Sequence, residues 1–253
     1  MPDLIALYGW PLLAAMAAAS VVIGFSKTSF GGIAALSVTV FALAMPAKES
    51  TATVLLLLIV GDLIAVLRYR TVSWRLLLKL VPSVIPGLLL GAVFMNVVDD
   101  TTMRRTIGVL LLVMVGIQLW QRLARPVADP APNTDPHWVR ASLTGTAAGF
   151  ATMTANAAGP VMALYFLAAR IDKARFIGTN AWFFAMINLS KVPLAASLGL
   201  FTVEGVVLDL FMVPAVLLGA LLGTWVVRHV SQRQFEVVTI VASALSALTL
   251  LLR

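Results

Sequence analysis

LLLKLVPSVIPGLLLGAVFMNVV, residues 76–98, is an apolar stretch that contains one charged residue, Lys79. A helix of roughly 20 apolar residues spans a hydrocarbon core about 30 Å thick. Because lipid offers no hydrogen-bond partners to the backbone, such a stretch must bond its own N–H and C=O groups. Residues 76–98 therefore predict a membrane-spanning helix.

Similar apolar segments recur along nearly the whole chain of 253 residues. Hydrophobic residues make up 60% of it and charged residues 11%, which is more apolar than one soluble core requires. We therefore expect an all-α polytopic membrane protein without a soluble domain. The predicted helical segments, of which the second, sixth and seventh are short for a full crossing, are residues 4–23, 31–45, 51–67, 76–98, 106–120, 138–151, 158–169, 176–198, 206–227 and 235–252.

The two halves of the chain share short patterns that occur in the same order. The matching residues are Val81-Pro82, Gly87 and Gly91 with Val213-Pro214, Gly219 and Gly223; Gly24-Phe25 with Gly149-Phe150; and Thr71-Val72 with Thr202-Val203. The first set returns after 132 residues and the second after 125. Three matches in one order predict an internal repeat.

Each predicted repeat crosses the membrane an odd number of times, so the second must be inverted relative to the first. We assign residues 1–120 to the first transmembrane repeat, 121–137 to a Pro-rich cytoplasmic linker and 138–253 to the second, inverted repeat. Each repeat has about five helical segments, with a break after its first helix. Inverted repeats place related half-sites near the bilayer midplane, where many secondary transporters bind substrate.

Lysine and arginine residues set the predicted orientation. Of the 18 in the chain, 13 fall on one side of the predicted crossings, and the positive-inside rule makes that side cytoplasmic. Both termini are then outside the cytoplasm. We expect a multi-pass protein of a bacterial inner (plasma) membrane.

Several classes of function are not expected. The chain has no cysteine, and His137 and His229 lie in polar connections, so neither a metal site nor a cofactor is predicted. The net charge of +7 is scattered among apolar segments and predicts no nucleic-acid partner. Gly61-Asp62 is only part of an intramembrane aspartyl protease motif, so an enzyme is not expected.

The first predicted break, GFSKTSFGG at residues 24–32, places Ser26, Lys27 and Thr28 among glycines. Glycine permits the backbone to unwind there. The next helix would then begin within the membrane, and its positive dipole end would favour an anion. The alternative is an ordinary cytoplasmic turn with a snorkelling lysine.

The second predicted break, residues 152–160, carries Asn156 and Pro160 but no charge. Proline suits an early helix position, and the amide of Asn156 could contact a ligand or cap a helix. We weigh these two roles of Asn156 equally.

Segment 176–198 places Asn188 and Lys191 three residues apart on one helix face. A lysine inside the membrane costs several kcal/mol unless it is paired, hydrated or bound to a ligand. A lysine that snorkels to the interface is the alternative. Thr179, near the start of this helix, could line the same cavity or simply pack.

Asp62 lies at almost the repeat-equivalent position of Asn188. It could form an ion pair with Lys27 or Lys191, or carry a proton, and we favour the ion pair. The acids Glu204 and Asp209 lie nearer a helix start and are predicted to cap it.

These residues resemble the TauE/SafE sulfite exporter family, also called the four-toluene sulfonate uptake permease family, over about residues 10–250. The matching features are Gly24 to Gly32 with Lys27, Asp62 followed by Arg68-Tyr69-Arg70, Asn156 to Pro160, and Gly178-Thr179 with Trp182, Phe183, Asn188, Lys191 and Pro193. The resemblance implies transport of sulfite, sulfonates such as sulfoacetate, or related organic anions, usually as export from the cytoplasm.

We therefore expect a secondary transporter that moves a small organosulfur or sulfur oxyanion by alternating access. An anion channel and a transporter of another small organic anion are the alternatives. The expected partners are the anion and the lipid bilayer, and both proton coupling and a homodimer are compatible with this architecture. The predicted substrate contacts are Ser26, Lys27, Thr28, Asn156, Thr179, Asn188 and Lys191, with Asp62 as the ion-pair or proton-coupling residue.

Overall fold

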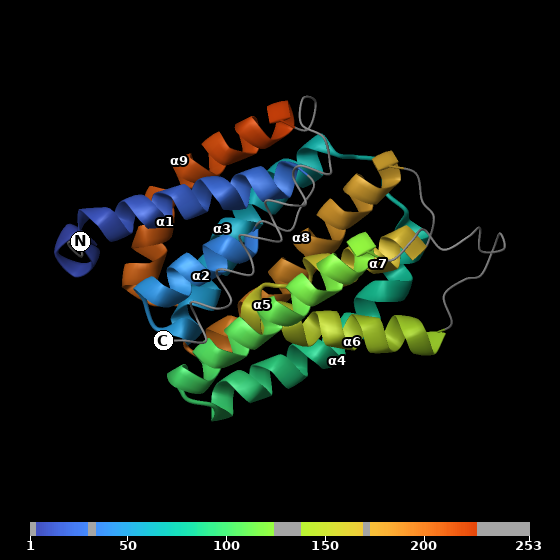
Figure 1. The fold of residues 1–253 in the computed structure, drawn as a ribbon, viewed down its shortest axis with the longest axis horizontal. Coiled ribbons are helices and arrows are strands. Elements are labelled where there is room, and N and C mark those ends of the chain that lie inside the picture. Colours follow the sequence, from blue (N-terminus) through green and yellow to red (C-terminus); the bar gives the residue numbers. More distant parts are fainter. Residues whose placement is uncertain (1–3, 30–33, 124–137, 169–172, 227–253) are drawn as a thin grey trace.

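The computed structural model describes residues 4–29, 34–123, 138–168 and 173–226, and all regular structure in these residues is helical (Figure 1). The helices are α1 (Leu4–Thr28), α2 (Ala34–Ala44), α3 (Ala47–Arg68), α4 (Trp74–Val97), α5 (Asp100–Leu123), α6 (Trp138–Ala155), α7 (Gly159–Ala168), α8 (Lys173–Ser197) and α9 (Val203–Val226). The predicted all-α architecture is confirmed. The tenth predicted segment, residues 235–252, lies outside the described residues.

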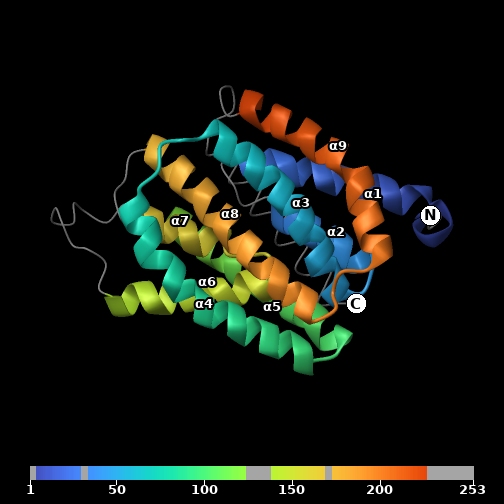
Figure 2. The same ribbon diagram turned by 180° about the vertical axis from the view of Figure 1, so that it is seen from behind.

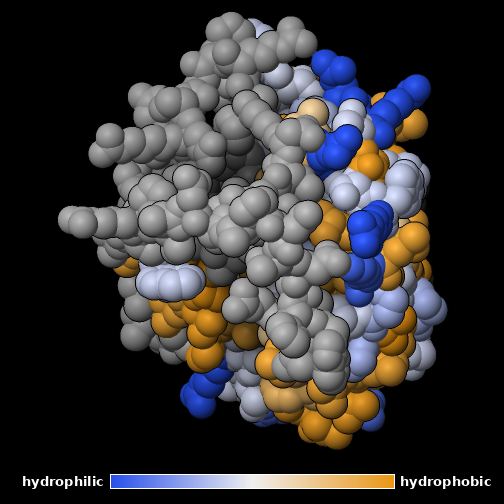
Figure 3. Space-filling view, turned by 90° about the vertical axis from the view of Figure 1, so that its right-hand side faces the viewer, coloured by the Kyte–Doolittle hydropathy of each residue, from blue (hydrophilic) through white to orange (hydrophobic). Residues whose placement is uncertain are grey.

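Five of these helices are long and apolar enough to cross a membrane, namely Leu4–Thr28, Ala47–Arg68, Trp74–Val97, Asp100–Trp120 and Val203–Trp225. Large apolar side chains lie exposed along them, such as Leu90 and Val93 on α4 and Leu210 and Leu221 on α9. Apolar side chains gather over wide areas of the face in Figure 3. Exposure of so much apolar surface to water would be unfavourable. The chain is therefore a multi-pass membrane protein.

Two of the predicted boundaries need correction. We expected the first helix to end near residue 23 and to unwind at Gly24, but α1 continues to Thr28. The helix predicted to end at residue 120 continues, as α5, to Leu123, and residues 124–137 lie outside the described part of the chain. Ser26, Lys27 and Thr28 therefore occupy the last turn of a helix rather than an unwound segment.

Gly24 has a packing role that explains this correction. A Cβ atom added to Gly24 would lie 1.9 Å from the carbonyl oxygen of Val216 on α9. From the other side, a Cβ on Gly219 would lie 1.9 Å from the carbonyl oxygen of Val21. Glycine at these positions lets the backbones of α1 and α9 touch, and the two helices run side by side in Figures 1 and 2.

Helices α4 and α6 pack in the same manner. A Cβ on Gly87 would lie 2.0 Å from the carbonyl oxygen of Thr146, and a Cβ on Gly149 would lie 2.2 Å from that of Val84. In the predicted repeat, Gly87 and Gly149 correspond to Gly219 and Gly24. The first helix of each half thus packs against the fourth helix of the other half, and the repeated glycines make both contacts.

Two helix ends are fixed by local hydrogen bonds, one at the start of α5 and one at the end of α8. Asp99 precedes α5 and its Oδ1 accepts a hydrogen bond from the backbone N–H of Thr102 at 2.8 Å, which is an N-cap. Hydrogen bonds from the side chain of Thr102 and from its backbone N–H lower the pKa of the exposed Asp99 carboxyl. Gly199 follows α8 with φ of 66°, and the N–H of Leu200 bonds back to the carbonyl of Ala195 at 3.1 Å.

Substitution of Gly87 by alanine should destabilise the protein, because its new methyl group would meet the α6 backbone, which cannot move independently. We expect a loss of about 1–3 kcal/mol, measured as a lower thermal midpoint in detergent. Gly116 is the matched control, because nothing lies within 4 Å of its added Cβ. Gly116→Ala should leave the midpoint unchanged or raise it, and equal losses in the two variants would contradict the packing role of Gly87.

Candidate functional site

A buried ion pair joins the last turn of α1 to the middle of α3. Lys27 Nζ lies 2.6 Å from Asp62 Oδ1, and the two side chains are 12% and 1% exposed. The Lys27 ammonium also lies 4.6 Å from the centroid of the Phe184 ring on α8, in cation–π geometry. The neighbouring Gly61 gives the lysine stem its room, since a Cβ there would lie 2.8 Å from Lys27 Cγ.

Asn188 of α8 extends this pair toward the second half of the chain. Its Nδ2 donates to Asp62 Oδ2 at 2.6 Å. Its Oδ1 accepts from Lys191 Nζ at 3.4 Å. Both carboxylate oxygens of Asp62 therefore have partners, one charged and one neutral.

Lys191 is 2% exposed and lies one turn beyond Asn188. Besides Asn188, its ammonium donates to Asn156 Oδ1 and, at 3.4 Å, to Thr152 Oγ1. Three acceptors match the three donors of a charged ammonium. All three are neutral oxygens, so no carboxylate contacts this lysine directly.

Asn156 marks the second helix break, which lies where the sequence predicts it. It follows the end of α6 with a φ of 50°, a left-handed conformation that asparagine tolerates better than most residues. Its N–H bonds to the carbonyl of Thr152 at 3.1 Å and closes the helix end. Its Nδ2 donates to the carbonyl of Thr51 at 3.0 Å, so the amide joins the break to α3 and still faces Lys191 through Oδ1.

We call this set the polar network; its members are Lys27, Asp62, Thr152, Asn156, Asn188 and Lys191. It runs from α1 through α3 and α8 to the break before α7 and so joins both halves of the chain. It contains two cationic side chains and one carboxylate, with a net charge of +1. Buried charge that lacks a counter-ion is costly, so the network is electrostatically suited to receive an anion.

The structure does not bring every predicted site residue into this network. Thr179 Oγ1 accepts from the backbone N–H of Ser73 at 2.9 Å, and it lies about 18 Å along α8 from Lys191. Thr28 Oγ1 donates to the carbonyl of Ala220 at 2.8 Å and so joins α1 to α9. Ser26 is buried in the same turn as Lys27.

Three contributors to the network were not predicted from the sequence as site residues. Thr152, one turn before Asn156, supplies a hydroxyl, and Thr51 supplies a backbone carbonyl. Phe184, one turn before Asn188, supplies its ring to Lys27. The spacing of four residues on a helix could have identified Thr152 and Phe184, whereas a backbone carbonyl carries no sequence signal.

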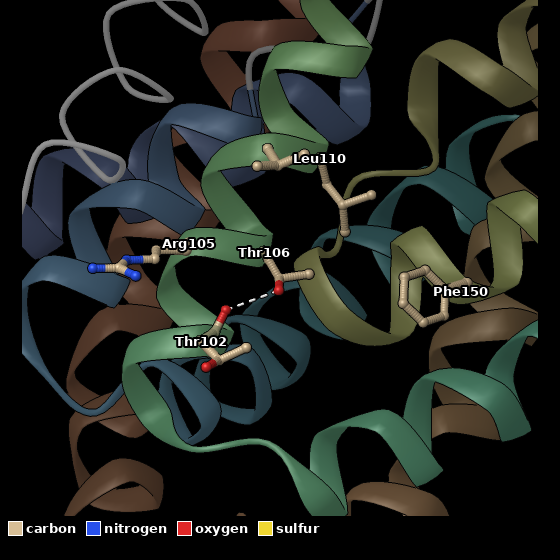
Figure 4. Close-up of a pocket in the computed structure, with 6 residues that line it drawn as sticks. Thr102, Arg105, Thr106, Leu110 and Phe150 are labelled. Atoms are coloured by element: carbon tan, nitrogen blue, oxygen red, sulfur yellow. Dashed lines mark hydrogen bonds between the residues drawn. The ribbon is translucent and has the colours of Figure 1, made fainter.

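Two grooves of about 400 Å³ lie at the protein surface, and neither is lined by the polar network. Figure 4 shows the groove between α5 and α6, where the Thr106 hydroxyl donates to the Thr102 carbonyl at 2.8 Å. The two grooves are lined by Thr102, Arg105, Thr106, Val109, Leu110 and Phe150, and by Arg68, Tyr69, Arg70, Thr71, Ala174 and Ile177. The network is therefore closed off from both of them in this conformation.

The described residues contain no group of three or more His, Cys, Asp or Glu side chains that could hold a metal ion.

The chain resembles one family of known proteins. A sequence model of the family described as Sulfite exporter TauE/SafE matches residues 16–250. No curated protein and no solved structure matches the chain.

Replacement of Asp62 by asparagine should destabilise the protein by about 3–5 kcal/mol, because Lys27 would remain buried without its counter-charge. The thermal midpoint in detergent measures this loss. The combined variant Lys27→Met, Asp62→Leu should recover much of it, since it buries no charge.

Arg104→Gln is the control for this experiment. It removes an ion pair with Asp100 of 3.6 Å whose side chains are 24% and 42% exposed, and it should cost at most about 1 kcal/mol. If Asp62→Asn cost no more than Arg104→Gln, the buried pair would not be a main source of stability.

Proposed function

The chain belongs to the TauE/SafE sulfite exporter family, and from this premise we propose that it exports a small sulfur oxyanion by alternating access. The family implies membrane transport of sulfur anions such as sulfite. Within that class we propose sulfite, sulfoacetate or a related sulfonate as the substrate. We place the protein in a bacterial inner membrane with both termini outside the cytoplasm, as the distribution of lysine and arginine favours.

The observation that carries this proposal is the buried ammonium of Lys191, which has only neutral oxygens as partners. Asp62 is engaged by Lys27 and Asn188, and it makes no ion pair with Lys191 in this conformation. One positive charge of the polar network is therefore left without a counter-ion. A hydrogen sulfite ion, or the sulfonate group of sulfoacetate, carries one negative charge that neutralises it.

Binding requires little rearrangement around Lys191. Two of its three hydrogen bonds are 3.4 Å long and therefore weak, so oxygens of an anion can replace them. The amides of Asn156 and Asn188 are close enough to Lys191 to orient the remaining oxygens. Helix α7 begins at Gly159, directly after the break, and its N-terminus adds a positive dipole end near the same position.

We assign different roles to the two lysines. Lys191 contacts the anion directly, whereas Lys27 is held by Asp62 while the site is empty. When an anion enters, it disturbs the hydrogen bond between Lys191 and Asn188. This change weakens the hydrogen bond that Asn188 donates to Asp62. In the empty network Asp62 is the counter-ion of Lys27 alone, which is the ion-pair role rather than that of a proton carrier.

Alternating access fits the way the helices are paired. The backbone contacts at Gly24 and Gly87 make α1 with α9, and α4 with α6, close pairs that can move as units. The polar network crosses from α1 and α3 to α6 and α8, and therefore lies between these two pairs. Relative rotation of the pairs would open the network to one side at a time.

A carrier agrees with the burial of the network better than an open anion channel does. Lys191 and Asp62 are 2% and 1% exposed, and the two surface grooves do not include them. A conducting pore needs a continuous wetted path past its binding residues. Saturable flux with a low turnover is therefore expected.

Lys191→Ala should abolish saturable transport of sulfite and sulfoacetate in proteoliposomes and weaken their binding by at least about 30-fold. That loss corresponds to about 2 kcal/mol or more for truncation of one partner of a buried charge pair. Binding is measured by titration calorimetry of the detergent-purified protein and transport by radiolabelled substrate.

Ser190→Ala is the matched control, because its side chain is exposed and its hydroxyl bonds only to the carbonyl of Met186. It should bind and transport as the wild type does. Unchanged transport by Lys191→Ala would sink the assignment of Lys191, and failure of the wild type to move any sulfur oxyanion would reject the proposed substrate class.

A further inference from the structure

Asp209 is a buried carboxyl group that the proposed transport mechanism does not use. The sequence predicts that it caps α9, but this prediction is wrong, because Asp209 lies nearly two turns beyond the helix start at Val203. Its side chain is 5% exposed. Among the described residues, neither carboxyl oxygen has a hydrogen-bond partner.

The residues that neighbour Asp209 on the buried face of α9 are apolar. Asp209 shares the buried face of α9 with Met212 and Val216, and this face packs against α1 and α3. The titratable or charged groups described on these three helices are Tyr8 and Lys27 on α1, Lys48, Glu49, Asp62 and Arg68 on α3, and Glu204 on α9. None of them makes a hydrogen bond or ion pair with Asp209. An ionised carboxylate without a partner is strongly disfavoured in such a site, so the group keeps a proton.

The repeat shows that the fold itself does not require an acid here. The position equivalent to Asp209 in the first half is Leu77 on α4, which is fully buried. Leucine therefore fills the same place in the corresponding helix pair. An unpartnered carboxyl in only one of the two halves lowers stability without a packing benefit, which points to a role in function.

Asp209 lies between one end of the helix bundle and the polar network. One turn before it, a Cβ on Gly205 would lie 3.0 Å from Thr53 Oγ1 on α3. About 10 Å after it along α9, Val216 Cγ1 lies 3.9 Å from the Cβ position of Gly61, the neighbour of Asp62. Helices α3 and α9 thus run in the same direction, and Asp209 lies on the side of the network where both helices begin, which the positive-inside rule predicts to be the outer side.

We propose that Asp209 is a proton-binding site, and that release of its proton opens the contact between α9 and α3 toward the side where these helices begin. In the conformation described, the protonated acid stays in the apolar contact. Once ionised, the carboxylate must be hydrated, and water can reach it only if the beginning of α9, with the adjoining part of α1, moves away from α3 while the Lys27–Asp62 pair still joins the end of α1 to α3. The same movement uncovers the path to Lys27 and Asp62.

This inference rests on the proposed transport of a sulfur oxyanion, but the proton itself can be measured without transport. Infrared spectra of the detergent-purified wild type should contain a carboxylic acid C=O band that is absent from Asp209→Leu. This variant carries the residue of the equivalent position, Leu77, and is expected to fold. A wild-type spectrum that lacks the band overturns the proposal.

Transport tests the opening step. Sulfoacetate is a suitable probe, because its sulfonate and carboxylate charges stay constant between about pH 6 and 9. Wild-type efflux from proteoliposomes of known orientation should rise with the pH on the side where α3 and α9 begin, by up to about tenfold per unit, as expected for loss of one proton. Asp209→Leu and Asp209→Asn should bind sulfoacetate normally and transport it slowly, with no dependence on that pH.

Glu204→Gln is the control, because Glu204 lies on the same helix but is exposed, and this variant should keep the wild-type pH profile. A pH profile that persists in the Asp209 variants overturns the opening step. A dependence on sodium that replaces the dependence on pH identifies a metal-cation ligand instead and also overturns the proposal. If the wild type moves no sulfoacetate but shows the acid band, the proposed substrate class fails while the proton site stands.

Discussion

The buried ion pair between Lys27 and Asp62 is the interaction on which the functional part of the structure depends. It fixes the end of α1 against α3 and orients Asn188, which in turn contacts Lys191. Because Asp62 pairs with Lys27 and Asn188, the ammonium of Lys191 contacts no counter-ion in the part of the chain that the structure describes. The Lys27–Asp62 pair therefore holds the network together, while the charge of Lys191 is not neutralised. An anion is the kind of ligand that would neutralise it.

The glycine contacts give this network its surroundings. Lipid provides little hydrophobic driving force between helices, so close backbone packing must stabilise the bundle. Gly24 and Gly219 allow it for α1 and α9, and Gly87 and Gly149 do so for α4 and α6. The first helix of each half thus packs against the fourth helix of the other half. The polar network lies between the two helix pairs.

The sequence predicts much of this arrangement, for identifiable reasons. Apolar length predicts the helices, because lipid leaves the backbone no other choice. The position of Asp62 deep in an apolar segment favours an ion pair with a lysine. The prediction that the helix unwinds at Gly24 was wrong. Glycine permits either an unwound backbone or a close helix contact, and the approach of α9 shows that Gly24 serves the contact. Tertiary contacts decide which face of a helix is covered, and the sequence does not show these contacts. For this reason the sequence did not reveal that Thr179 packs against Ser73 or that Asp209 is buried. The inversion of the repeats and the domain boundaries stay predictions.

The central claim is that a sulfur-type oxyanion binds at Lys191. Selenite has the shape and charge of sulfite, and selenium scatters X-rays anomalously, so crystals soaked with selenite can locate the ion directly. The account predicts an anomalous peak within hydrogen-bond distance of Lys191 Nζ, next to Asn156 and Asn188. A peak at the groove beside Arg68 and Arg70 with none at Lys191 would contradict it.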